Sequence, residues 1–188
     1  MKHLKIMALA AVAAMAFMAF AAGSASADLY TDAAKTVKYA KGTTIVSSLA
    51  PGGSAALKSG SSTIATCTGG EVHGTTENET GTVTGGISSL TWTGCSQTTH
   101  TVANGKLSIA TNGDVTGSGS QVTLGIFGVS CTYGTGEGTK LGTLSSGETP
   151  VLKINANIAK VAGGFLCPST GTWEAEYIVT TPHALYVG

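Results

Sequence analysis

The sequence predicts an all-β protein, an antiparallel β-sandwich of about ten short strands joined by two disulfides. From residue 43 onward, short runs alternate apolar and polar residues with a period of two, which is the pattern of half-buried strands. Turn residues, mainly Gly and Asn, separate these runs at regular intervals. A β-solenoid is the alternative, but the sequence has no fixed repeat period of the kind that solenoids need.

The first 27 residues have the composition of an export signal. A basic start at residues 2–5 precedes an uncharged, Ala-rich run over residues 6–22, and residues 25–27 (Ala-Ser-Ala) fit the small-x-small cleavage rule. A retained membrane anchor is the alternative, but the run is short and no basic stop follows it. We therefore expect a secreted protein that has a single domain, residues 28–188, and no transmembrane anchor after cleavage.

The charge composition argues against a nucleic-acid partner. Residues 28–188 contain eight Lys, ten acidic residues and no Arg, which gives a formal charge of about −2. Arg supplies the bidentate fork that recognises phosphate and guanine. A mildly acidic surface also provides no electrostatic steering toward a polyanion.

Strand patterns occupy most of the chain after residue 43. Residues 28–41 form either a short helix or an N-terminal strand, and residues 185–187 are expected to add one last pairing. Strands are expected at residues 43–46, 61–68, 87–94, 121–127, 151–161 and 172–181. Glycines at 69, 70, 74, 85 and 86 predict a loop or short hairpin between the second and third of these strands.

Two Asn-Gly pairs predict tight hairpins. Asn104-Gly105 and Asn112-Gly113 each lie between short β-like runs. Both central residues of a type I′ turn need positive φ, which Asn-Gly tolerates best. Residues 98–117 are therefore expected to form an antiparallel meander of three short strands.

The four cysteines are expected to form two disulfides, because exported proteins fold in an oxidising compartment. Of the three possible pairings, the sequential one is preferred, Cys67–Cys95 and Cys131–Cys167. A zinc site is the alternative, but no two cysteines lie two to four residues apart and no His pair flanks them. We expect no metal and no other cofactor.

Motifs of catalysis are absent from the sequence. The three histidines at 73, 100 and 183 form no i, i+2 or i, i+4 pair, and no Gly-x-Ser-x-Gly elbow occurs. Glu174 and Glu176 share one strand face about 7 Å apart, a spacing that could serve a glycosidase or bind calcium, but a solvated strand face is expected. We therefore expect no catalytic residues.

The two tryptophans are the candidates for the core or for a ligand platform. Trp92 shares an apolar strand face with Leu90 and is expected in the core. Trp173 lies on an apolar face but has Glu174 and Glu176 as neighbours, which indicates a half-exposed strand. Trp173 is therefore the ligand-contact candidate.

Five motifs follow one another along the chain after the Ala-x-Ala site. They are TCTGG (66–70), LTWTGC (90–95), NGKLSI (104–109), SCTYGTG (130–136) and FLCPSTGTWEAEYIVTTP (165–182). This order resembles a group of small secreted bacterial proteins without an assigned activity, and it is more loosely similar to the exported protein activator of alkane oxidation. The resemblance implies an extracellular, non-enzymatic role in hydrocarbon use or surface attachment. It lies in Cys and Gly placement and carries over no functional residues.

Taken together, these features predict a secreted, non-enzymatic surface or binding protein. Its expected partner is a small apolar compound, a glycan or a cell surface. A carbohydrate-binding module and a secreted hydrolase without a recognisable motif are the alternatives.

Overall fold

The computed structural model describes residues 27–77, 82–126 and 128–188, so the predicted export signal lies outside the described residues except for Ala27. The described chain is built from strands alone, and it has no helix long and apolar enough to cross a membrane. The strands are β1 (Leu29–Tyr30), β2 (Thr44–Leu49), β3 (Ala55–Ser59), β4 (Ser62–Thr76), β5 (Val83–Cys95), β6 (Thr99–Ala103), β7 (Lys106–Ile109), β8 (Asp114–Ser118), β9 (Gln121–Ile126), β10 (Val129–Gly134), β11 (Thr139–Ser145), β12 (Val151–Ala162), β13 (Thr170–Thr181) and β14 (Tyr186–Val187).

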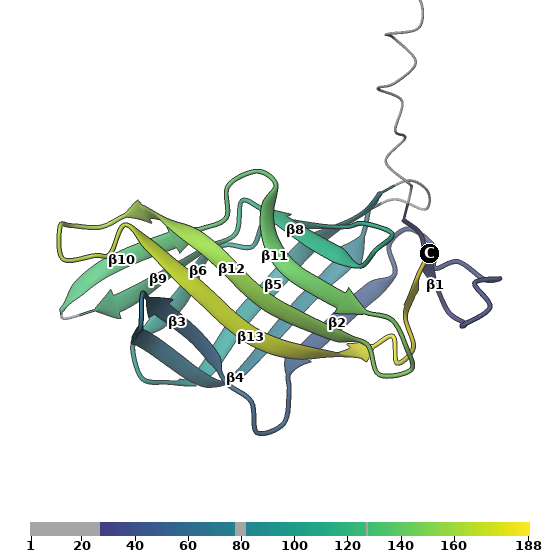
Figure 1. Ribbon diagram of the computed structural model, residues 1–188, viewed down its shortest axis with the longest axis horizontal. Helices are drawn as coiled ribbons and strands as arrows, with labels where there is room; N and C mark the ends of the chain where they lie inside the picture. The colour runs from purple at the N-terminus through teal and green to yellow at the C-terminus, as the bar shows by residue number, and fades with distance from the viewer. Residues whose placement is uncertain (1–26, 78–81, 127) are drawn as a thin grey trace, which may run out of the picture.

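The main sheet closes into an eight-stranded barrel, so the predicted all-β class is confirmed but the sandwich and the solenoid are wrong (Figure 1). The order β4-β5-β7-β8-β11-β12-β13 is closed by β2, which pairs with both β13 and β4. Every pairing is antiparallel. A sandwich and a barrel bury the same alternating face of each strand, so strand patterns do not distinguish them.

Four long strands, β4, β5, β12 and β13, change partners along their length and divide the barrel into two halves. In the half nearer to β1 and β14, which we call the near half, β7, β8 and β11 connect β5 to β12, and β2 lies between β13 and β4. In the other half, the far half, β10, β9 and β6 extend from β12, and β3 lies between β13 and β4.

One strand junction of the far half lacks a backbone ladder. β6 pairs with β9 on one side, while its other side faces β5 through three side-chain hydrogen bonds, one of them from the Thr99 hydroxyl to Cys95 Sγ at 3.5 Å. The Thr101 hydroxyl donates to the Leu90 carbonyl, and the Asn104 amide donates to the Ser88 carbonyl at 2.9 Å. We call this junction the β5–β6 seam.

The glycine-rich segment forms paired strands, so of the predicted loop or short hairpin over residues 69–86 the structure has a hairpin, longer than expected, between β4 and β5. β4 continues through Gly69, Gly70 and Gly74, and β5 already includes residues 85 and 86. These glycines allow close strand contact: a Cβ at Gly69 would overlap the Thr93 hydroxyl, and one at Gly74 would lie 2.7 Å from the residue 86 carbonyl oxygen.

The two Asn-Gly pairs have different roles, so one hairpin prediction is confirmed and the other is wrong. Asn112-Gly113 joins the paired strands β7 and β8, and Gly113 has φ 81°. Asn104-Gly105 also has positive φ, 74° at the glycine, but β6 pairs with β9 instead of β7. This turn carries the chain from the far half into the near half, and the predicted three-stranded meander does not form.

The strand patterns near the C-terminus are confirmed. Along β12 the inward positions are Leu152, Ile154, Ala156 and Ile158, and along β13 they are Trp173, Ala175, Tyr177 and Val179. Residues 185–187 contribute β14, which pairs with β1. Residues 28–41 contain β1 and no helix.

Both expected disulfides are present, and both lie in the far half. Cys67–Cys95 joins directly opposed residues of β4 and β5. Cys131–Cys167 joins β10 to the loop between β12 and β13.

Gly142 on β11 offers a direct test of strand contact. A Cβ at this position would overlap the Lys153 carbonyl oxygen of β12. Gly142→Ala is therefore expected to lower the free energy of unfolding by about 1–3 kcal/mol through overpacking. Gly136→Ala is the matched control, because its Cβ would meet only the Thr139 hydroxyl, at 3.8 Å. Urea unfolding followed by tryptophan fluorescence measures both, and equal midpoints for the two variants would contradict the prediction.

Candidate functional site

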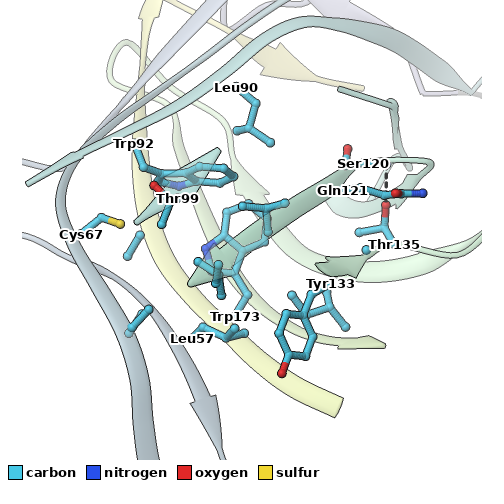
Figure 2. Close-up of a pocket in the computed structure, with 17 residues that line it drawn as sticks. Leu57, Cys67, Leu90, Trp92, Thr99, Ser120, Gln121, Tyr133, Thr135 and Trp173 are labelled. Carbon is cyan, nitrogen blue, oxygen red and sulfur yellow. Dashed lines mark hydrogen bonds between the residues drawn. The ribbon is translucent and has the colours of Figure 1, made fainter. Parts of the chain in front are cut away.

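An apolar pocket lies inside the far half of the barrel (Figure 2). It has a volume of about 60 Å³, and each of the eight strands of that half contributes to its wall. Its main apolar side chains are Leu57, Leu90, Trp92, Leu124, Ile158 and Trp173. The pocket therefore exists only because the far half is closed on itself.

Two tryptophans form the centre of the pocket wall. The rings of Trp92 and Trp173 meet edge to face with centroids 6.1 Å apart, and Trp173 meets Tyr177 in the same way at 6.4 Å. Such pairs stabilise an aromatic cluster by about 0.5–1.5 kcal/mol beyond area burial. Figure 2 shows the two indoles side by side, and they come from different strands, β5 and β13. Trp92, expected in the core, and Trp173, the ligand-contact candidate, thus line one pocket.

Tyr177 fixes the orientation of Trp92. The Trp92 indole Nε1 donates a hydrogen bond to the Tyr177 hydroxyl at 3.3 Å. Tyr177 is only 1% exposed. Burial raises the pKa of Tyr177 to about 12, while the hydrogen bond from Trp92 acts weakly in the opposite direction. The phenol is therefore a neutral structural acceptor at ordinary pH.

Trp173 differs from Trp92 in its polar atom. Its indole Nε1 has no hydrogen-bond partner in the described part of the chain. Within residues 27–77, 82–126 and 128–188, one side-chain polar atom is both fully enclosed and unpaired, and it is a carboxylate oxygen of Asp28, not the Trp173 nitrogen. The Trp173 N–H is thus unpaired and not completely enclosed, so it can donate to a bound molecule.

The β5–β6 seam borders the pocket. Leu90 and Trp92 of β5 and Thr99 of β6 all contribute to the pocket wall. The seam has side-chain hydrogen bonds from Thr99, Thr101 and Asn104 in place of a ladder. The seam is therefore the part of the pocket wall that is not closed by a backbone ladder.

The pocket volume limits what it holds. A water molecule needs about 10–15 Å³, while an engineered cavity of about 150 Å³ binds benzene. At about 60 Å³, the pocket accepts a group of a few heavy atoms in its present shape. A larger ligand requires the pocket wall to move outward.

A second apolar cavity, of about 80 Å³, lies in the near half. Aliphatic side chains dominate its wall, among them Ile45, Val72, Leu107 and Leu152. It contains no aromatic side chain and has no counterpart of the Trp173 N–H. The far-half pocket is therefore the better candidate for specific binding.

The paired carboxylates on β13 lie outside the barrel. Glu174 forms an ion pair with Lys58 at 2.5 Å, and Glu176 forms one with Lys153 at 3.6 Å. These four side chains border a wide surface groove whose wall has no aromatic residue. The described residues hold no cluster of three metal-ligating side chains. Each carboxylate is thus part of a cross-strand ion pair, as on a solvated strand face.

One of the three histidines meets a carboxylate. His73 Nε2 lies 3.2 Å from Glu71 Oε2, and both side chains are exposed on β4. Ser89 is the cross-strand neighbour of His73. None of these residues lines a cavity described above.

The fold and the pocket define a disulfide-linked β-barrel with an apolar interior site. Comparison with known proteins gives no match, whether to a protein-family model, to a curated protein or to a solved structure. The resemblance to secreted bacterial proteins stays a prediction.

Proposed function

We propose that this is a secreted, non-enzymatic binding protein that holds a small apolar compound, or the apolar end of a larger one, in the far half of the barrel. The observation that carries this proposal is the interior pocket with the Trp92–Trp173 pair in its wall. Pockets with mostly apolar walls and a few placed polar groups are the usual sites for small molecules.

The hydrogen-bond donors in the pocket wall indicate which class of ligand the pocket fits. The Trp92 N–H is already bound by Tyr177, so the Trp173 N–H is the free indole donor. A ligand with an apolar body and a single hydrogen-bond acceptor fits this arrangement. A glycan fits it less well, because sugar platforms need exposed aromatic faces and both tryptophans face the interior.

Two further observations support a location outside the cytoplasm. Both disulfides are of a kind that persists in oxidising compartments. The Ala-rich N-terminal run followed by Ala-Ser-Ala fits an export signal. The resemblance to the activator of alkane oxidation is consistent with an apolar ligand.

Binding of 1-hexanol tests the proposal, with ethylene glycol as the polar control. The protein is expected to show a higher Tm and a blue-shifted tryptophan emission with 1-hexanol, and neither change with ethylene glycol. Trp173→Ala is expected to weaken the affinity about tenfold, because a large part of the apolar contact is lost. Val37→Ala is the matched control, since Val37 is exposed and lies outside the pocket.

A pocket-filling variant keeps the test independent of folding defects. Ala65 lines the pocket from β4, and Ala65→Val places two methyl groups in it without removing a contact. This variant should fold and lose 1-hexanol binding. The proposal is overturned if the unaltered protein shows no response, or if Trp173→Ala and Ala65→Val both bind as the unaltered protein does.

A further inference from the structure

An exposed apolar group lies at the end of the barrel far from the C-terminus. Phe165 is 94% exposed, Leu166 is 49% exposed, and Val161 at the end of β12 is 53% exposed. We call these three residues the apolar tip. In Figure 1 the loop that carries Phe165 and Leu166, between β12 and β13, projects at the end of the molecule opposite to the C-terminus.

The loop is held in place by covalent and hydrogen bonds. The Cys131–Cys167 disulfide ties it to β10. The Lys160 ammonium donates to the carbonyls of Gly164, at 3.3 Å, and Cys167, at 3.2 Å, and the Cys167 N–H donates to the Gly164 carbonyl at 3.1 Å. Phe165 is therefore presented to solvent by a braced loop.

Three other connections share this end of the barrel. The turn after β3 is near the loop because Lys58 opposes Thr172 at the start of β13. The turn after β9 lies near the loop because the next strand, β10, carries Cys131, which is bonded to Cys167 of the loop. The turn after β5 lies beside β9, because the Gly125 N–H donates to the Thr98 carbonyl at 2.9 Å. The apolar tip is thus surrounded by four connections between strands, residues 60–61, 96–98, 128 and 163–169, which we call the platform.

This platform lacks negative charge. Its described connections, residues 60–61, 96–98, 128 and 163–169, contain no Asp or Glu, and Lys160 is the charged residue beside the tip. Gly, Ser and Thr make up much of these connections. The end with the apolar tip therefore meets an anionic or zwitterionic surface without charge repulsion.

We propose that the apolar tip docks this end of the barrel on a phospholipid bilayer, with Phe165 and Leu166 inserted at the interface. Interfacial binding depends on burial of apolar side chains at the headgroup boundary, which the apolar tip offers, and no acidic residue in the described connections around the tip opposes it. The Ser- and Thr-rich platform can hydrogen-bond to headgroups. A second copy of the chain fits less well, because three side chains bury far less than the roughly 800 Å² per partner of a stable dimer.

Vesicle flotation tests the docking. Residues 28–188, which contain every described strand, are used with both disulfides intact, because the apolar run at residues 6–22 would bind lipid by itself. The protein is expected to float with vesicles of phosphatidylcholine and phosphatidylglycerol. Phe165→Ser with Leu166→Ser should lower the partition coefficient about ten- to a hundredfold, as expected for the loss of one to two buried apolar side chains.

Matched variants separate lipid docking from other effects. Val37→Ser removes a similarly exposed valine outside the tip and should float as the unaltered protein does. Phe165→Trp should gain fluorescence that brominated lipids quench, above the signal of Trp92 and Trp173. The tip variant should still bind 1-hexanol, so the two proposals fail separately.

Three outcomes would overturn the proposal. The first is that the protein does not float, and the second is that the tip variant floats as well as the unaltered protein. The third is a concentration-dependent dimer that the tip variant abolishes while lipid binding is absent, which would assign the tip to a second copy of the chain.

Discussion

Removal of the Cys67–Cys95 disulfide is expected to lower the free energy of unfolding by about 3–4 kcal/mol. The bridge closes a loop with a sequence separation of 28 residues, and chain entropy in the unfolded state gives this magnitude. Domains of this size are stable by about 5–15 kcal/mol, so the loss is a large fraction of the total. The bridge also lies beside the pocket, since Cys67 is part of its wall.

Urea unfolding of Cys67→Ala with Cys95→Ala, followed by tryptophan fluorescence, measures the loss. The matched control is Thr68→Ala with Thr93→Ala, which changes two exposed neighbours on the same strands and should alter the midpoint little. Removal of Cys131–Cys167, with a separation of 36 residues, should cost a similar amount and also release the loop that carries the apolar tip. If removal of either disulfide lowered the free energy of unfolding by less than about 1 kcal/mol, the prediction would be contradicted, and the unfolded chain would have to be restricted even without the disulfides.

Local strand patterns could be predicted from the sequence, but the closure of the barrel could not. The alternation along β12 and β13 predicts two strands with one buried face each, and both occur. Closure depends on β2 pairing with β13, for example Ser48 opposite Ile178. These residues are far apart in the sequence, and neither carries a local signal that selects the other.

Turn residues in the sequence predict the local backbone conformation, but they do not predict which strands pair. Gly105 and Gly113 both have positive φ, but Asn104 and Asn112 do not, so the type I′ conformation expected from Asn-Gly is wrong at the asparagines. Only the second glycine lies in a hairpin, because Thr101 and its neighbours pair with β9 and leave β7 to β5 and β8. The same limit explains the glycines of β4, whose missing side chains serve strand contact instead of a turn.

Part of the candidate site could be predicted from the sequence. Trp173 could be nominated because its apolar face and its acidic neighbours are local features. Its contact with Trp92 joins β13 to β5 across the interior and exists only after closure. The hydrogen bond from Trp92 to Tyr177, and the part of the pocket wall from β6 and β9, depend on the same closure.

Tyr177 is expected to make the fold sensitive to alkali. Burial raises the pKa of Tyr177 to about 12, against about 10 in the unfolded chain. Below pH 10 the phenol is protonated in both states and stability is fully present. Between pH 10 and 12 the unfolded phenol releases its proton while the folded one keeps it, so the free energy of unfolding falls by about 3 kcal/mol. Burial also raises the pKa of Tyr39 and of Tyr133, and both add to the loss.

Tyr177→Phe separates this effect from general alkaline unfolding. At pH 8 the variant loses the hydrogen bond from Trp92, which costs about 1 kcal/mol. As the pH rises, the free energy of unfolding of the variant should fall less steeply than that of the unaltered protein, because the variant lacks the ionisable phenol. The free energies of unfolding of the two proteins should therefore become equal near pH 11. Urea midpoints at pH 8 and pH 11 measure this, and Tyr186→Phe is the matched control that should keep the steep loss. Parallel losses in the Tyr177→Phe variant and the unaltered protein would mean that the Tyr177 phenol does not control the alkaline stability of the barrel.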